Sequence, residues 1–357
     1  MKLIYSLLIL LLGWMAIAIF PANRFEFLQH NMWTIEDGLP INSTTSFIQG
    51  SNGYLWIGTE AGLVRFDGVE FDVFNHENVE VFTADIVTDI LEDNRGAIWI
   101  ATRGDGVVRY QDGKFDNFRE NSGLLSDKVW CLMKSLDGSI WIGSKGGINR
   151  YDNGKLTTIP LPETLSSHWV TCMVANPRAR VWVGTYRDGL IALDPREKDF
   201  EIEYLGPPGE KIITLLEDRK GTLWIGTIEN GLIRYQEGTR QAFTTANGLS
   251  VNYIQCLFED RAGNLWIGTF GGGINFLPPE NMERDGGRII FSFPRQQEFS
   301  SRMIYRIFQD REGTMWIGTL GGGLNSLRDT KIHTYTTRNG LSSDNVYGVF
   351  QDQTGRL

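Results

Sequence analysis

One short segment recurs seven times along the chain, and each copy carries a tryptophan. The copies read LWIGT, IWIAT, IWIGS, VWVGT, LWIGT, LWIGT and MWIGT, and their tryptophans are Trp56, Trp99, Trp141, Trp182, Trp224, Trp266 and Trp316. Successive tryptophans lie 41 to 43 residues apart, except that the last two lie 50 apart. A repeat of this length indicates a solenoid, a propeller or an array, and the content of one unit decides among them.

Each unit consists of short apolar runs separated by turn residues. In the sixth unit, YIQCLFED is followed by RAG, NLWIGT, FGGG and INFL, and other units add a last strand with an aromatic residue, as in RQAFTTANGL. This pattern is typical of strands joined by hairpins. Because the first two strands of a unit are almost continuously apolar, both of their faces must be covered. We therefore expect an all-β fold, a seven-bladed β-propeller of four-stranded antiparallel blades, with each tryptophan filling the gap between neighbouring blades.

The turns between the strands repeat as well. The turn before the tryptophan strand reads EDNRG, EDRKG, EDRAG or QDREG in four units, and we expect its Asp to accept hydrogen bonds from backbone N–H groups. Unit four departs from this pattern, with Asn176 and Ala179, so its turn is expected to differ. The Thr or Ser that ends each tryptophan segment is expected to bond the backbone of the following turn, which ends in glycine.

The first twenty residues differ from the rest. MKLIYSLLILLLGWMAIAIF places one lysine before a long apolar run, and Pro21 closes it. The run is slightly long for a signal-peptide core and just long enough to span a bilayer. We expect residues 1–22 to be a signal peptide or a membrane anchor, with Lys2 on the cytoplasmic side and the bulk of the chain exported.

Composition and cysteine positions exclude some functions. The formal net charge is -9 without a basic cluster, which argues against nucleic-acid binding. Cys131, Cys172 and Cys256 each lie ten residues before a repeat tryptophan. At that position the other units carry Ser46, Asp89, Thr214 and Arg306. A position that accepts such different residues does not indicate a disulfide framework, so we expect small, partly buried strand residues there.

Catalytic chemistry is hard to find in the sequence. The four histidines are scattered and show no metal-ligand spacing: His30, His76, His168 and His333. The serines lack a nucleophile-elbow context, and the GGG stretches have no helix behind them to bind phosphate. We therefore expect no catalytic residue, no metal site and no cofactor in this chain.

A ring of variable loops is the best candidate for ligand binding. In a propeller of this topology, the loops after the second and the fourth strand of each blade share one face. The loops after the second strand differ in charge and shape between units, whereas the turns on the other face are nearly identical. The candidate ligand-binding residues are Glu60, Arg103, Asp105, Lys145, Tyr186, Arg187, Asp188, Glu229, Asn230 and Phe270.

The two ends of the repeat array compete to close the ring. Trp33 falls six residues before Leu39, as an aromatic residue falls six before the corresponding leucine in other units. We expect the stretch 31–35 to be the outer strand of the blade that carries residues 303–327. The segment 332–336 competes for that edge, and we favour the N-terminal strand.

Domain boundaries follow from the same register. The propeller is expected over residues 24–336, and residues 337–357 are expected to start a truncated further repeat, because residue 358 would be the eighth tryptophan. We therefore expect the sequence to be a fragment. The extra residues of the sixth unit, PPENMERDGGR at 278–288, are expected to form an exposed loop.

Two stretches together resemble a known family. WTIEDGLPINSTTSFIQGSNGYLWIGTEAGLVRFDGVEF and FEDRAGNLWIGTFGGGINFL resemble the two-component regulator propeller repeat, and the resemblance covers nearly all of the chain after residue 30. It implies the periplasmic ligand-sensing region of a membrane-bound histidine kinase or hybrid sensor, with the kinase outside this chain.

Other readings remain open at this point. The resemblance also admits the sensor region of a diguanylate cyclase, and the fold admits a secreted propeller enzyme or an interaction scaffold. The implied location is periplasmic, exported or anchored to the inner membrane. The implied partners are an unknown small molecule or oligosaccharide, and a second copy of the full-length parent. Contact with the membrane is expected only through the N-terminal segment or a missing C-terminal part.

Overall fold

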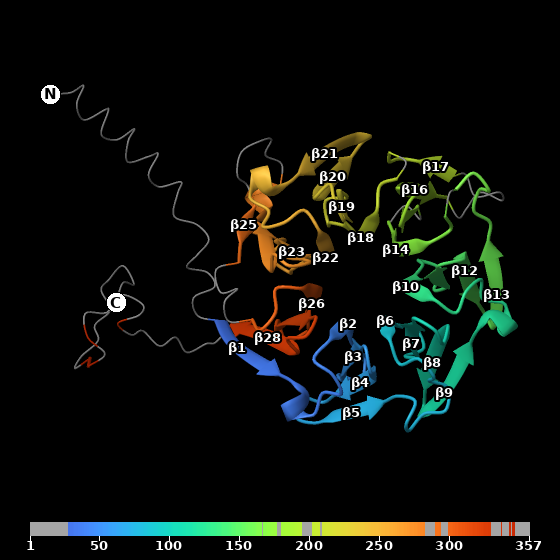
Figure 1. Cartoon of the computed structure of the whole chain (residues 1–357), viewed down its shortest axis with the longest axis horizontal. Helices are drawn as coiled ribbons and strands as arrows, with labels where there is room; N and C mark the ends of the chain where they lie inside the picture. The colour runs from blue at the N-terminus through green and yellow to red at the C-terminus, as the bar shows by residue number, and fades with distance from the viewer. Residues whose placement is uncertain are drawn as a thin grey trace. The chain divides into compact units, whose positions relative to one another are not determined.

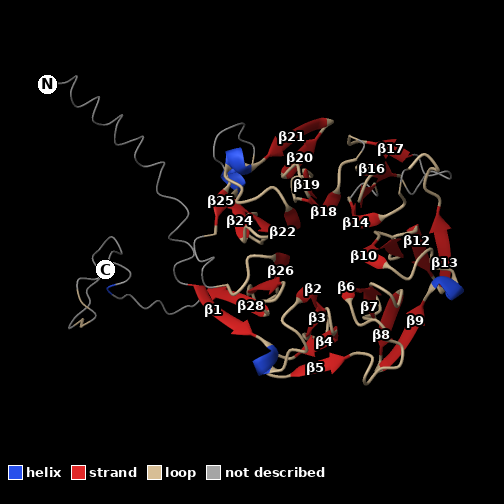
Figure 2. Ribbon diagram, viewed as in Figure 1, coloured by secondary structure: helices blue, strands red, loops and turns tan. Residues whose placement is uncertain are grey.

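The structure is a computed structural model in which almost all regular elements are strands (Figure 2). It describes residues 28–329 apart from 166, 177–179, 195–201, 208, 283–289 and 294–298, together with positions 337, 343, 345 and 346. Residues 31–326 form one unit, and residues 1–30 with 327–357 form another. Residues 31–326 build a ring of seven blades (Figure 1), which confirms the expected fold. The described residues contain no helix that is long and apolar enough to cross a membrane.

Each blade is a four-stranded sheet, and its strands follow one another outwards from the axis. The innermost strands are β2 (Thr44–Gln49), β6 (Val87–Glu92), β10 (Val129–Lys134), β14 (Val170–Ala175), β18 (Ile212–Glu217), β22 (Ile254–Glu259) and β26 (Ile304–Gln309). The second strands, which carry the repeat tryptophans, are β3 (Leu55–Thr59), β7 (Ile98–Thr102), β11 (Ile140–Ser144), β15 (Val181–Thr185), β19 (Leu223–Thr227), β23 (Leu265–Thr269) and β27 (Met315–Thr319).

The outer half of each blade is less regular. The third strands are β4 (Gly62–Phe66), β8 (Val107–Gln111), β12 (Gly147–Asp152), β16 (Leu190–Leu193), β20 (Leu232–Gln236), β24 (Ile274–Leu277) and β28 (Leu324–Asp329). The outermost strands are β5 (Phe71–Phe74), β9 (Lys114–Phe118), β13 (Lys155–Ile159), β17 (Ile202–Tyr204), β21 (Thr239–Phe243), β25 (Phe291–Ser292) and, in the last blade, β1 (Leu28–Trp33). The described 3₁₀ helices are η2 (Ile35–Asp37), η3 (Glu120–Ser122), η4 (Thr245–Asn247) and η5 (Pro279–Asn281).

The repeat tryptophans hold neighbouring blades together, as the sequence predicts. Six of the seven are no more than 7% exposed, and the seventh, Trp316, is partly buried. Trp224 on β19 shares a hydrophobic cluster with Ile254 and Leu265 of the next blade. Trp99 on β7 likewise packs with Val129 of the next blade. Burying a side chain of this size contributes on the order of a few kcal/mol per blade.

The aspartate of the turn before each tryptophan strand has a second role that sequence reasoning missed. In the fifth blade, one Asp218 carboxylate oxygen accepts hydrogen bonds from the Thr222 and Lys220 N–H groups, as expected. The other oxygen accepts the indole N–H of Trp224 at 2.8 Å. The same bond forms between Asp93 and Trp99, Asp260 and Trp266, and Asp310 and Trp316. The turn and the buried ring are therefore fixed by a single side chain.

The remaining blades depart from this arrangement. In the fourth blade, Asn176 accepts from the Arg180 N–H, and the Trp182 indole donates to Glu217 of the next blade at 2.9 Å. In the third blade, the Trp141 indole donates to a serine hydroxyl instead. The Asn176 side chain accepts the N–H four residues on, as Asp218 does, so this part of the fourth turn does not differ as expected and only the partner of the indole changes. Ala179 lies outside the described residues.

The glycine of the tryptophan segment permits close packing of blades. A Cβ atom at Gly143 would lie 2.4 Å from Cys131 Sγ and 2.8 Å from a Val170 methyl carbon of the next blade. The following Thr or Ser hydroxyl donates to the carbonyl of the turn glycine in all seven blades, as expected. These turn glycines have φ between 68° and 128°, a region that favours glycine.

The N-terminal strand closes the ring, as we favoured. β1 is the neighbour of β28 in the last sheet, in the order β1-β28-β27-β26. Trp33 lies 5.5 Å from Trp316 and 5.6 Å from Phe66 of the first blade, measured between ring centroids. The strand ends at Trp33, slightly earlier than the expected stretch 31–35. The competing segment 332–336 lies outside the described residues.

The long insertion in the sixth blade does not follow its prediction. Met282 is only 5% exposed and joins the hydrophobic cluster that contains Trp224. Its carbonyl accepts a hydrogen bond from the Arg234 guanidinium at 2.5 Å. Pro278 and Asn281 are buried as well, so the start of the insertion packs against the ring instead of forming an exposed loop. Residues 283–289 lie outside the described part.

The tryptophan–aspartate unit can be tested in the fifth blade. Trp224→Ala should lower the free energy of unfolding by about 3–5 kcal/mol through the cavity that it leaves. Asp218→Ala should lower it by about 1–3 kcal/mol, because the indole and turn N–H groups lose their acceptor. Thr239→Ala, on the exposed outer strand of this blade, is the control. Urea unfolding measures all three, and equal losses for Asp218→Ala and Thr239→Ala would contradict the assignment.

Ring closure gives a second prediction. Trp33→Ala should cost about 2–3 kcal/mol, less than a fully buried tryptophan, because Trp33 is only partly buried. A chain that begins at Asn42 should unfold at a lower temperature than a chain that ends at Asp329. Calorimetry of both chains decides the matter, and equal transition temperatures would show that β1 does not lock the ring.

Candidate functional site

A cavity of about 430 Å³ opens along the axis of the ring, on the face of the variable loops. We call it the channel cavity. Its wall comes from the innermost strands and from the loops that precede and follow the inner hairpins. The aromatic residues of the wall are Trp130, Trp169, Tyr186, Tyr253, Phe270 and Tyr305. Its volume lies in the range of small-molecule sites.

Five of the six aromatic rings of the wall form two groups. Trp130 lies 5.1 Å from Trp169, and Trp169 stacks on Tyr186 at 4.2 Å, measured between centroids. Tyr253 stacks on Phe270 at 5.0 Å in the sixth blade. Stacked rings from several blades therefore line one space.

A charged pair crosses the inner end of the cavity. Asp89 on β6 and Arg306 on β26 come from blades that are not neighbours, and their charged atoms lie 3.6 Å apart. Burial raises the pKa of the Asp89 carboxyl, while the Arg306 charge and the Leu132 N–H, at 2.9 Å, act in the opposite direction. Asp89 is therefore already engaged with the protein.

The cysteines of the inner strands are free and unreactive. Burial raises the pKa of Cys172 and of Cys256 to about 12, and it raises the pKa of Cys131 as well. The thiolate is the nucleophilic form, so these thiols stay protonated at neutral pH. Within the described ranges, no group of three His, Cys, Asp or Glu side chains could hold a metal ion.

Half of the predicted ligand-binding residues lie at or near the channel cavity. Arg103, Tyr186 and Phe270 line it. The Lys145 ammonium lies 6.0 Å from the centroid of the Trp169 ring. The Glu60 charge contributes to raising the pKa of the Tyr305 hydroxyl, after the larger effect of burial.

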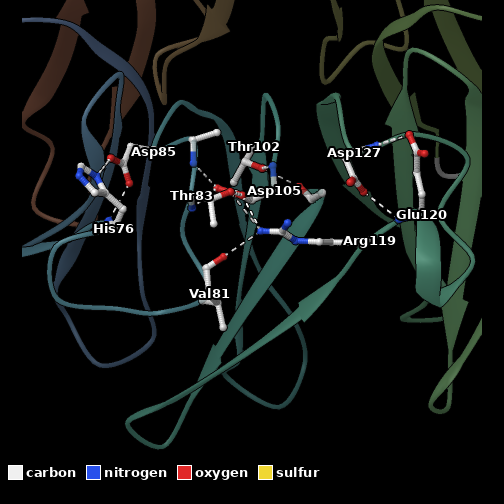
Figure 3. A network of polar contacts seen from close by, with 11 residues as sticks. His76, Val81, Thr83, Asp85, Thr102, Asp105, Arg119, Glu120 and Asp127 are labelled. Atoms are coloured by element: carbon white, nitrogen blue, oxygen red, sulfur yellow. Dashed lines mark hydrogen bonds and ion pairs between the residues drawn. The ribbon is translucent and has the colours of Figure 1, made fainter.

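The other predicted residues hold loops in place. Asp105 is fully buried, accepts the Thr83 and Ala84 N–H groups at 2.8 Å, and pairs with Arg119 at 2.6 Å (Figure 3). The backbone N–H groups of Asp105, Asp188 and Asn230 all donate to the threonine three residues before them.

Two further candidates are engaged by neighbouring groups. Glu229 pairs with Lys211 at 2.7 Å. The Arg187 carbonyl accepts the Gly209 N–H at 2.8 Å, and its side chain is exposed. Neither lines the channel cavity, so their part in ligand binding stays a prediction.

Sequence reasoning missed four wall residues: Trp130, Trp169, Tyr253 and Tyr305. They lie one or three residues before the variable position of the innermost strand, where the other units carry no aromatic residue. The missed signal was available, since Trp130 and Trp169 are tryptophans that fall outside the repeat register.

The structural role of Asp105 can be tested. Asp105→Ala should lower the free energy of unfolding by about 3–5 kcal/mol, because Arg119 would be left as an uncompensated, partly buried charge. Asp72→Ala breaks an exposed pair with Arg65 and should cost less than about 1 kcal/mol. Thermal and urea unfolding measure both variants. If Asp105→Ala lowers the free energy of unfolding by less than about 1 kcal/mol, the residue is not structural and ligand contact again becomes its expected role.

Comparison with known sequences identifies the repeat. The family described as Two component regulator propeller matches residues 38–61, 82–104, 206–229, 248–271 and 298–321. These segments run from the innermost strand of a blade into the loop after its second strand. A search of curated proteins gives no match.

Solved structures with the same fold include extracellular domains of two-component systems and lyases. The extracellular domain of the hybrid two-component system BT3049 from B. thetaiotaomicron has a TM-score of 0.72 and 26% identity, over 85% of this chain and 42% of that one. The extracellular domain of BT4673 from the same organism has a TM-score of 0.67 and 23% identity, over 85% and 40%. This chain thus spans less than half of either domain.

The same architecture also serves catalysis. Virginiamycin B lyase from Staphylococcus aureus has a TM-score of 0.65 but only 17% identity, over 84% of this chain and 98% of that one, so this likeness concerns the fold alone. The repeat match and the sensor domains carry more specific information. Five segments of the seven-bladed ring therefore match the repeat of the two-component regulator propeller family.

Proposed function

We propose that the chain is the extracytoplasmic ligand-sensing propeller of a membrane-bound two-component signalling protein, and that its ligand binds in the channel cavity. The observation that supports this proposal most is the composition of the cavity wall. Six aromatic side chains from several blades converge on one space, on the face where the loops vary. The similarity to extracellular domains of two-component systems supports the location and the signalling role.

The wall suits binding better than catalysis. Its thiols stay protonated, and its carboxylate, Asp89, is engaged with Arg306 and backbone N–H groups. The wall therefore supplies flat rings and hydrogen-bond donors, which hold a ligand, rather than a pair of groups that could exchange a proton with it. An enzyme of the lyase type remains the second candidate because the fold is shared.

Ligand binding at this place can influence several blades together. The wall includes Arg103 of the second blade, Tyr186 of the fourth, Phe270 of the sixth and Tyr305 of the seventh. A ligand that contacts all of them links strands that are otherwise joined only through their immediate neighbours. Ordering these contacts stabilises one arrangement of the ring, which is how a bound ligand shifts a population between states.

The proposal is tested by ligand screening followed by two wall variants. A library of small molecules and oligosaccharides is screened by thermal shift, and each hit is titrated calorimetrically. Tyr186→Ala and Phe270→Ala should weaken binding about tenfold, or about 1.4 kcal/mol. Tyr204→Ala, an exposed aromatic residue on the outer strand of the fourth blade, is the control.

Mass spectrometry of the recovered ligand separates the two candidate functions. Intact ligand after long incubation supports a sensor, and conversion of the ligand supports an enzyme. Unchanged affinity in both wall variants would place the binding site elsewhere and contradict the proposal.

A further inference from the structure

We propose that the channel cavity contains an anion subsite at Arg103, Trp130, Lys145 and Trp169, and that it takes a carboxylate carried on a flat ring. This inference rests on the proposed function in placing the ligand in the cavity, and it adds the chemical class of that ligand. Its evidence consists of unpartnered donors, unpaired cations and the arrangement of the rings.

The first observation concerns buried hydrogen-bond donors. The Arg103 Nε, Trp130 Nε1 and Trp169 Nε1 atoms are buried and have no hydrogen-bond partner in the described part of the chain. All three are donors, and all three belong to residues of the cavity wall. Buried donors are normally satisfied, because leaving one without an acceptor costs free energy. A ligand that carries hydrogen-bond acceptors would satisfy these three donors of the cavity wall.

The second observation concerns charge. Arginines on the third strands of three blades, Arg65, Arg109 and Arg150, are each paired with a carboxylate. Arg103 and Lys145, by contrast, have no ion-pair partner among the described residues, although the chain carries a net charge of -9. In so acidic a protein, unpaired cations beside one cavity make that place attractive to an anion.

The third observation is the arrangement of the rings. The Arg103 guanidinium lies over the Trp130 ring at 4.5 Å, and the Lys145 ammonium lies 6.0 Å from the Trp169 ring. Trp130, Trp169 and Tyr186 follow one another at 5.1 and 4.2 Å. Arg103 therefore lies at the Trp130 end of this row, and Lys145 lies beside its central ring, Trp169. A flat ring can pack against this row while its carboxylate meets the cations and indole N–H groups.

A carboxylate of the same blades does not neutralise these two cations. Asp89, on β6 of the second blade, is paired with Arg306 of the last blade at 3.6 Å and accepts the Leu132 N–H at 2.9 Å. The charges of Arg103 and Lys145 therefore stay uncompensated at the second and third blades, and the acidic end of the ligand is expected to point towards them.

Two isosteric probes test this assignment, 2-naphthoate and its neutral amide, 2-naphthamide. Calorimetric titration of the full chain should show naphthoate binding at least tenfold more tightly than naphthamide, with the difference shrinking as salt is raised. Arg103→Gln and Lys145→Gln should each remove most of this preference. Arg180→Gln is the matched control, because Arg180 lies over the Trp182 ring at 4.8 Å but pairs with Glu203 outside the cavity.

The indole donors have their own test. Trp130→Phe and Trp169→Phe keep an aromatic face and remove the N–H group, so they should weaken naphthoate more than naphthamide. Equal affinity for the two probes, or an effect of Arg180→Gln equal to that of Arg103→Gln, would overturn the anion subsite. If both probes bind equally and Tyr186→Ala weakens both, the cavity is a binding site of another class, so only the anion subsite fails.

Discussion

The contact between a buried tryptophan of one blade and the apolar strands of the next is the interaction on which this structure depends. The inner strands of each sheet are apolar on both faces and have no solvent-exposed face. A single blade alone would leave these faces in water, so it cannot be stable. Each tryptophan packs against the apolar face of the adjacent blade. In four blades the indole N–H also donates a hydrogen bond to an aspartate of the preceding turn. The ring is complete when β1 supplies the missing outer strand beside β28.

In each blade, the residues that stabilise the ring are different from the residues that line the cavity. The turns on one face are constrained by the aspartate bonds, and the glycines between blades are constrained by contacts such as that of Gly143 with Cys131. Residues that begin the innermost strands and follow the second strands are free of these constraints. They include Trp130, Trp169, Tyr186 and Tyr253, at positions where most other blades carry no aromatic residue. Variation at these positions builds the cavity without loss of the ring.

The fold could be predicted from the sequence because its determinants repeat. Trp33 was placed correctly on the closing blade because its spacing to Leu39 matches that of other outer-strand aromatics. The site was predicted less well, since it depends on which residues converge on the axis. Asp105 and Arg103 are two residues apart, yet one is buried in a structural ion pair and the other lines the cavity. Met282 packs into a gap that no local pattern reveals.

The central claim is that the ligand of this propeller binds on the axis, against the aromatic wall. A crystal structure of the chain with its highest-affinity ligand tests that claim most directly. The account predicts ligand density in the channel cavity, in contact with Trp169 and Tyr186 and with its acidic group towards Arg103. Density on the outer edge of the blades, or on the face of the invariant turns, would contradict it.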